Sequence, residues 1–213
     1  MKGAILSVLA STLTLGASAA FADYEHHGHK DRYRYNHKDV QAYFDCAWTP
    51  AARFEGTITD AVVATAAGDS PEFTVLLTAV LAAGLEGVLA GEGPFTVYAP
   101  TDAAFGAVPE PLVGLLLSDP TGLLTDVLAY HVVTEKSKRT DPRRVYRSAR
   151  EVETFNGQSV FLSRNGGPQV NGSEVACTPV KTSNGVIYVI DSVLLPQFLQ
   201  PEQEQEPEPA LKH

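Results

Sequence analysis

The chain has 213 residues and a formal net charge of −9, with 44% hydrophobic residues and 19% charged residues. This length is sufficient for one domain with a full hydrophobic core and a tail at each end. The excess of acidic residues argues against a general nucleic-acid-binding protein.

The first 22 residues have the pattern of a secretory signal peptide. Lys2 supplies a positive start, residues 4–15 form a short apolar run, and Ala20-Phe21-Ala22 fits a cleavage site before Asp23. The apolar run is too short to span a bilayer comfortably, and no later stretch predicts a transmembrane segment. We therefore expect an exported protein. Removal of 22 residues, including one lysine, leaves 191 residues with a net charge of −10.

Residues 23–53 are expected to form a His-rich N-terminal arm. Four of the six histidines lie in it, namely His26, His27, His29 and His37. One hypothesis is a metal or small-ligand site, because imidazole is the commonest metal ligand. The alternative is a mobile terminus, because nothing fixes the geometry of these side chains. Helical spacing of Val40, Tyr43, Phe44 and Trp48 around Cys46 predicts a short amphipathic helix.

The domain, expected over residues 54–198, opens with two predicted helices. The sequence Thr57-Ile58-Thr59-Asp60 has the form of a capping box and predicts the first start. Ser70-Pro71 predicts the second start, and Gly84 predicts its end. Between them, Phe73, Leu76, Leu77, Val80 and Leu81 recur at helical spacing.

A short strand and three more helices are expected next. In the strand, Phe95, Val97 and Ala99 share one face and Thr96 and Tyr98 the other. Thr101 is placed to cap a helix that carries Asp102 in its first turn. Two further helices are predicted over residues 111–117 and 119–130.

The second half of the domain is predicted to be mostly antiparallel sheet. It contains four Asn-Gly dipeptides, a strong hairpin signal, at Asn156, Asn165, Asn171 and Asn184. Helices first and hairpins later indicate the α+β class. Asn171-Gly172-Ser173 is also a glycosylation acceptor by pattern, which matters only in a eukaryotic source. The tail over residues 199–213 is rich in Pro, Glu and Gln and is expected to be disordered.

The only two cysteines, Cys46 and Cys177, are expected to form a disulfide rather than reactive thiols. The bond would tie the arm to a late strand. In the chain-entropy model, closing a loop of about 130 residues contributes roughly 4–5 kcal/mol as an upper figure.

Three blocks carry a resemblance to a known family: residues 93–105, 126–133 and 184–196. Together and in this order they closely resemble the fasciclin domain, an extracellular module of adhesion and matrix proteins. The resemblance implies small twisted sheets that form a wedge or sandwich beside a helical region. It also implies an adhesive role for the Tyr-His pair, here Tyr130 and His131. The alternative role of His131 is a hydrogen-bonded residue that holds a helix end against the core.

The segment over residues 136–150 departs from the family pattern by its charge. It has seven basic residues and one acid, a net charge of +6, whereas the rest of residues 54–198 has two basic residues and 15 acids. We expect it either to bind sulfated or uronic-acid polysaccharide or to be a solvated loop that neutralises the protein's own acids. Changing Arg143, Arg144 and Arg147 to Glu is expected to abolish such binding without unfolding the domain. The candidate cations are Lys136, Lys138, Arg139, Arg143, Arg144, Arg147 and Arg150.

No pattern of a nucleophile, a metal-binding motif or a phosphate-binding loop is present, so no enzyme, cofactor or catalytic residue is predicted. The leading hypothesis is a secreted fasciclin-like protein that binds a cell-surface or matrix protein, or an anionic polysaccharide. The alternative is an extracellular carrier of metal or a small ligand that uses the His-rich arm. Asp102 and Asp191 are expected to stabilise backbone donors and not to act in catalysis.

Overall fold

The computed structural model describes residues 46–47, 49–69, 71–135, 139–145, 148–164 and 167–199. The predicted signal peptide, the four histidines of the arm and the tail from residue 200 lie outside these ranges, so the predictions for them stay predictions. Lys136, Lys138 and Arg147 of the basic segment also lie outside.

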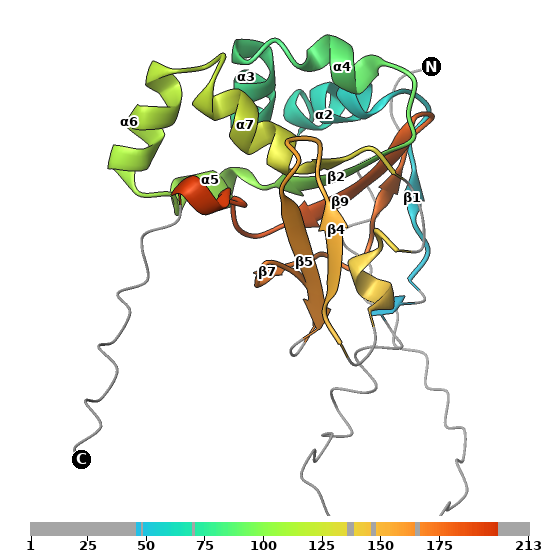
Figure 1. The fold of residues 1–213 in the computed structure, drawn as a ribbon. Coiled ribbons are helices and arrows are strands. Elements are labelled where there is room, and N and C mark those ends of the chain that lie inside the picture. Colours follow the sequence, from blue (N-terminus) through green and yellow to red (C-terminus); the bar gives the residue numbers. More distant parts are fainter. Residues whose placement is uncertain are drawn as a thin grey trace, which may run out of the picture.

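Helices cover one face of a central five-stranded sheet, and a second sheet lies on its other face (Figure 1). The strands of the central sheet lie in the order β1 (Ala52–Arg53), β8 (Val180–Lys181), β9 (Gly185–Ile190), β2 (Phe95–Pro100) and β3 (Val132–Val133). This sheet is mixed, because β2 pairs with β9 and β1 pairs with β8 in parallel. The second sheet is antiparallel throughout, in the order β4 (Arg150–Glu153), β5 (Ser159–Arg164), β6 (Pro168–Val170) and β7 (Ser173–Glu174). The predicted α+β class is confirmed.

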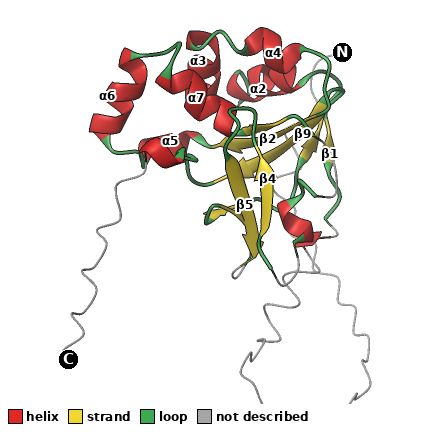
Figure 2. Ribbon diagram, in the orientation of Figure 1, coloured by secondary structure: helices red, strands yellow, loops and turns green. Residues whose placement is uncertain are grey.

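The helical layer forms from the first half of the described chain (Figure 2). Its helices are α2 (Ile58–Ala66), α3 (Thr74–Ala82), α4 (Glu86–Ala90), α5 (Asp102–Gly106), α6 (Glu110–Ser118) and α7 (Leu123–Tyr130). Short 3₁₀ turns, η1 (Pro142–Arg144) and η2 (Gln197–Leu199), follow later. Within the described ranges no single helix is long and apolar enough to cross a membrane. Helices α6 and α7 have the required length and hydrophobicity only when they are taken together, and the chain bends by 110° between them.

Helix α2 begins as its sequence predicts. The Thr57 side chain accepts a hydrogen bond from the backbone of Asp60, and the Asp60 carboxylate accepts one from the backbone of Thr57. This reciprocal pairing satisfies two N–H groups that a helix start leaves without partners.

Helix α3 begins later than predicted, at Thr74 instead of after Ser70-Pro71. Its N-cap residue is Phe73, which adopts a left-handed backbone with φ of 65° and offers no side-chain cap. The cap comes instead from Asp102 of α5, whose carboxylate accepts hydrogen bonds from the backbone N–H groups of Thr74 and Val75. The prediction that Asp102 stabilises backbone donors is therefore confirmed, at the start of α3, and Thr101 caps α5 as predicted.

Strand β2 alternates as predicted, but both of its faces are buried. Phe95, Val97 and Ala99 pack into a cluster between the central sheet and the helices. Tyr98 belongs to a second cluster, between the two sheets, with Tyr188 and Leu162 among its members. The central sheet is thus the middle layer of the molecule, and the side chains at the end of α7 reach both cores.

The predicted Asn-Gly turns all fall between antiparallel strands. Asn171 and Gly172 join β6 to β7 with φ values of 49° and 86°, the left-handed conformation that tight hairpin turns need. Asn165 and Gly166 themselves lie outside the described residues.

Candidate functional site

Tyr130 and His131, predicted as adhesion residues, are both buried, with exposed fractions of 2% and 3%. The Tyr130 hydroxyl donates to the carbonyl of Ser159 at 2.9 Å and accepts from the Asn171 side-chain amide at 2.8 Å. It therefore ties α7 to the second sheet. Both side chains are buried, and His131 reaches only the floor of the apolar groove described below, so the expectation of an exposed adhesion pair is corrected to a pair in the core.

His131 is held between two backbone groups. Its Nδ1 lies 2.7 Å from the carbonyl of Val127, and its Nε2 accepts the backbone N–H of Leu194 at 2.9 Å. Because Nε2 accepts, the ring proton must be on Nδ1 and the imidazole is neutral. Burial lowers the pKa of His131 to about 4, which outweighs the opposing hydrogen bond to Val127. These contacts support the alternative role for His131, a hydrogen-bonded residue that holds the end of a helix against the core.

Arg143 is also buried, with 7% of its side chain exposed. Its Nε and Nη2 atoms donate to the two carboxylate oxygens of Asp141 at 3.0 and 2.9 Å. Its Nη1 donates to the carbonyls of Thr49 and Cys177 at 2.9 and 3.1 Å. The guanidinium also lies over the ring of Tyr188, 5.8 Å from its centroid.

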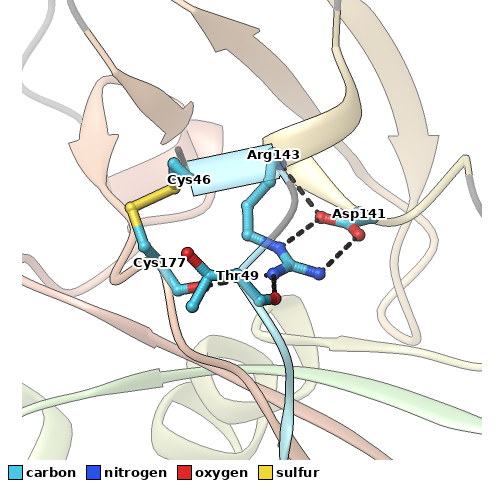
Figure 3. Close-up of a disulfide and its surroundings, with 5 residues drawn as sticks. All are labelled: Cys46, Thr49, Asp141, Arg143 and Cys177. Carbon is cyan, nitrogen blue, oxygen red and sulfur yellow. Dashed lines mark hydrogen bonds and ion pairs between the residues drawn. A yellow bond between two sulfur atoms is a disulfide. The ribbon is translucent and has the colours of Figure 1, made fainter. Parts of the chain in front are cut away.

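These contacts place Arg143 beside the predicted disulfide between Cys46 and Cys177, which is confirmed (Figure 3). The disulfide and Arg143 together fix the start of the described chain to the η1 turn and to the bend before β8, where Cys177 lies, rather than to a strand as expected. The expectation that Arg143 offers its guanidinium to a ligand was therefore wrong. Four of its five N–H donors are used by Asp141, Thr49 and Cys177, and the side chain is buried, so Arg143 is not available to a polysaccharide.

The other described cations of the basic segment are nearer the solvent. Arg139 is exposed, Arg144 is 40% exposed and donates to Asp141, and Arg150 donates to the carbonyl of Arg139. A shallow polar depression of about 570 Å³ lies at this edge of the second sheet. It is lined by Arg139, Ser148, Ala149, Arg150, Glu151, Glu153 and Ser159.

An apolar groove of about 350 Å³, which sequence reasoning missed, opens among α3, α5, α6 and α7. Val108, His131 and Val193, which lie outside these helices, complete its lining. On its rim, Val75 and Leu117 are 41% and 63% exposed. The signal in the sequence was Leu115-Leu116-Leu117, because three consecutive leucines on a surface helix cannot all face the core. The helical residues of the lining include Val75, Ala79, Phe105, Leu116, Leu124 and Val127.

The remaining polar candidates serve the fold. The Asp191 carboxylate accepts hydrogen bonds from the Ser173 hydroxyl and the Glu174 backbone, as predicted. Asn171, the glycosylation acceptor by pattern, uses its side-chain amide to bond Tyr130 and Phe161. Across the part of the chain that the structure describes, no three His, Cys, Asp or Glu side chains gather where they could hold a metal ion.

Comparison with known proteins agrees with the three sequence blocks. The chain is 39% identical over 158 residues to Protein sll1483 of Synechocystis, covering 68% of this chain and 85% of that protein. It is 37% identical over 140 residues to Immunogenic protein MPB70 of Mycobacterium bovis, covering 63% and 68%. It is 32% identical over 140 residues to Cell surface glycolipoprotein MPB83 of the same species, covering 63% and 60%.

Among solved structures, a similar one is the FAS1 domain pair from the insect cell adhesion molecule Fasciclin I, with a TM-score of 0.43 and 16% identity, over 57% of this chain and 44% of that one. The family model of the fasciclin domain matches residues 71–196. Since this match spans more than half of the chain, the protein belongs to the fasciclin domain family.

Proposed function

We propose that this protein is an exported, non-catalytic binding protein that acts in cell adhesion or in the extracellular matrix. Membership of the fasciclin family supports this role, and one relative is named a cell surface glycolipoprotein. The disulfide supports export, because such bonds persist in oxidising compartments. The histidine and the arginine that could have served chemistry, His131 and Arg143, both have buried backbone partners.

The ligand that we propose is an anionic polysaccharide, and the observation that supports it is the separation of charge. The basic segment over residues 136–150 carries +6 on a domain that is otherwise acidic. Burial of Arg143 does not reduce this value, because its charge and that of Asp141 cancel within the core. Six cations remain, and Arg139, Arg144 and Arg150 of these are described at or near the surface.

The polar depression beside Arg139 and Arg150 would hold part of the ligand. Guanidinium groups pair with sulfate or carboxylate through two parallel hydrogen bonds. Glu151 and Glu153, on the same rim, would accept hydrogen bonds from sugar hydroxyls. This mixed lining favours a sugar that carries both anionic groups and hydroxyls over a simple anion.

The test is retention of the full-length mature protein on an immobilised sulfated polysaccharide in a salt gradient. We expect retention at low salt that falls steeply as salt is added, because screening weakens surface charge pairs. A variant with Lys136, Lys138 and Arg139 changed to Glu should elute at much lower salt. The matched control changes Arg53, Arg164 and Lys181 to Glu, which alters the net charge equally but outside the segment.

Two results would overturn the proposed ligand. One is the absence of retention at low salt. The other is equal loss of retention in both triple variants, which would mean that total charge and not the basic segment determines binding.

A further inference from the structure

The apolar groove lies in a part of the protein that carries no positive side chain. Residues 54–135, which supply all of its helices, contain eleven Asp and Glu residues and no Lys or Arg. His131, the one histidine there, is neutral because its Nε2 accepts a hydrogen bond. The helices that form the groove therefore surround its apolar floor with acidic residues and supply no basic one.

Several of these acids belong to the helices that form the groove. Glu110 begins α6, Asp119 follows its end, and Asp126 lies on α7; all three are exposed. Two acids near the groove also serve the fold: Asp102 caps the start of α3, and the Asp119 carboxylate accepts hydrogen bonds from the backbone N–H groups of Gly122 and Leu123 at the start of α7. Glu110 lies on the same face of α6 as the lining residues Val113 and Leu117, so its exposed carboxylate is placed to meet a cation that extends from a ligand of the groove.

The size and shape of the groove suit a few side chains rather than a whole domain. Its volume of about 350 Å³ is near the lower end of the roughly 300–1,000 Å³ of ligand pockets. Exposed Val75 and Leu117 widen the apolar surface at its rim. Helix-in-groove recognition has these features, with apolar anchors on one face of a peptide helix.

We propose that the groove binds a cationic amphipathic helical segment of a partner protein. The apolar face of that segment would fill the groove, and its Lys or Arg side chains would lie near Glu110 and Asp119, at the two ends of α6. The negative charge of residues 54–135 favours this occupant, because an anionic lipid or an acidic peptide would be repelled. The protein's own tail is unsuitable for the same reason, since residues 200–213 contain four Glu and one Lys.

The test uses three labelled 18-residue peptides and fluorescence anisotropy on the mature protein. The first peptide has a leucine stripe at positions i, i+3, i+4 and i+7 with Lys elsewhere. The second has the same composition in scrambled order, and the third has Glu in place of Lys. We expect the first to bind at least tenfold more tightly than either of the others, and more weakly as salt is added.

A pair of protein variants tests the location. Leu117→Gln changes a rim residue, whereas Leu81→Gln is the matched control, because Leu81 is 55% exposed on α3 and does not line the groove. Both leucines are more than half exposed, so neither change should unfold the domain. Leu117→Gln should weaken binding of the striped peptide at least fivefold, and Leu81→Gln should leave it unchanged.

Other outcomes would overturn the proposal. Equal binding of the striped and scrambled peptides would mean attraction by charge alone, and equal effects of the two leucine variants would place binding elsewhere. Binding of phosphatidylcholine vesicles in place of the peptide would assign the groove to lipid. A dimer that Leu117→Gln dissociates would assign it to a second copy of the chain.

Discussion

The backbone N–H of Leu194 donates to Nε2 of His131 at 2.9 Å, which joins the end of α7 to the chain that follows β9. This bond exists only while the imidazole is neutral, because a protonated Nε2 is a donor and would face another donor. Protonation of one ring therefore breaks a tie between residues that lie 63 positions apart in the sequence.

The first prediction is a loss of stability in mild acid. The folded pKa of His131 is about 4 and its ordinary value is 6.5. Above pH 6.5 neither state binds the proton; as the pH falls from 6.5 to 4, only the unfolded state does, so the free energy of unfolding decreases. The decrease is about 3 kcal/mol over this interval. Urea unfolding at pH 7.5, 6.0, 5.0 and 4.0 measures it.

His131→Gln is the control for this prediction. It keeps a side-chain acceptor near Leu194 but cannot titrate, so its stability should change less between pH 7.5 and 5.0. The other five histidines of the chain are present in both proteins and cancel in the comparison. Parallel curves for the two proteins would contradict the assignment of the acid sensitivity to His131.

The second prediction concerns the cap that Asp102 provides to α3. Its carboxylate accepts from Thr74 N at 3.1 Å, from Thr74 Oγ1 at 2.6 Å and from Val75 N at 2.9 Å. Desolvation raises the pKa of Asp102, but these hydrogen bonds outweigh it and leave the pKa below its ordinary value. Asp102→Ala should lower the free energy of unfolding by about 1–2 kcal/mol in urea titrations.

Asp126→Ala is the matched control, because Asp126 is exposed on α7. Its effect should stay within about 0.5 kcal/mol. In a Thr74→Val background, the cost of Asp102→Ala should shrink, since the hydroxyl that it bonds is already absent. An unchanged cost in that background would exclude coupling between the two side chains.

Local signals in the sequence predicted the parts of the fold that local chemistry determines. The Thr57 capping box and the Asn171-Gly172 turn need only neighbouring residues, and both were confirmed. The parallel pairing of β2 with β9 brings together residues far apart in the sequence, such as Phe95 and Gly185. No local pattern specifies which strands pair. The start of α3 was missed for the same reason, because its cap comes from Asp102, 28 residues away.

The candidate site was predicted less well, because a run of charges indicates exposure only on average. Arg143 is the exception within its segment, and its partners include carbonyls 94 and 34 positions away. The one local sign was Asp141, the only acid in the run. The groove depends on how four helices pack against one another, and the hydrophobic periodicity of each helix does not predict that packing.

The third prediction concerns the disulfide. Replacement of both Cys46 and Cys177 by Ser removes a link across 131 positions. The free energy of unfolding should fall by up to about 4–5 kcal/mol, because the unfolded chain regains the conformational freedom that the link denied it. Urea unfolding of the double variant, compared with the oxidised and the dithiothreitol-reduced native chain, measures the loss. A reduced native chain as stable as the oxidised one would contradict the prediction.

The last prediction separates the buried arginine from its exposed neighbour. Arg143→Ala leaves the Asp141 carboxylate without its ion-pair partner and deprives the carbonyls of Thr49 and Cys177 of a donor. Removal of one partner from a buried pair costs about 3–5 kcal/mol. Arg144→Ala is the matched control, since Arg144 is 40% exposed and its pair with Asp141 should contribute less than about 1 kcal/mol. Chemical denaturation of both variants at pH 7.5 gives the two values.

Arg143→Ala combined with Asp141→Ala should cost less than the sum of the two single changes, because the double variant buries no unpaired charge. Additive costs would show that the guanidinium acts through its carbonyl partners alone. Equal, small costs of Arg143→Ala and Arg144→Ala would contradict its burial altogether. A variant that reverses the charge of Arg143 therefore confounds unfolding with loss of binding, which is why the polysaccharide test changes Lys136, Lys138 and Arg139 instead.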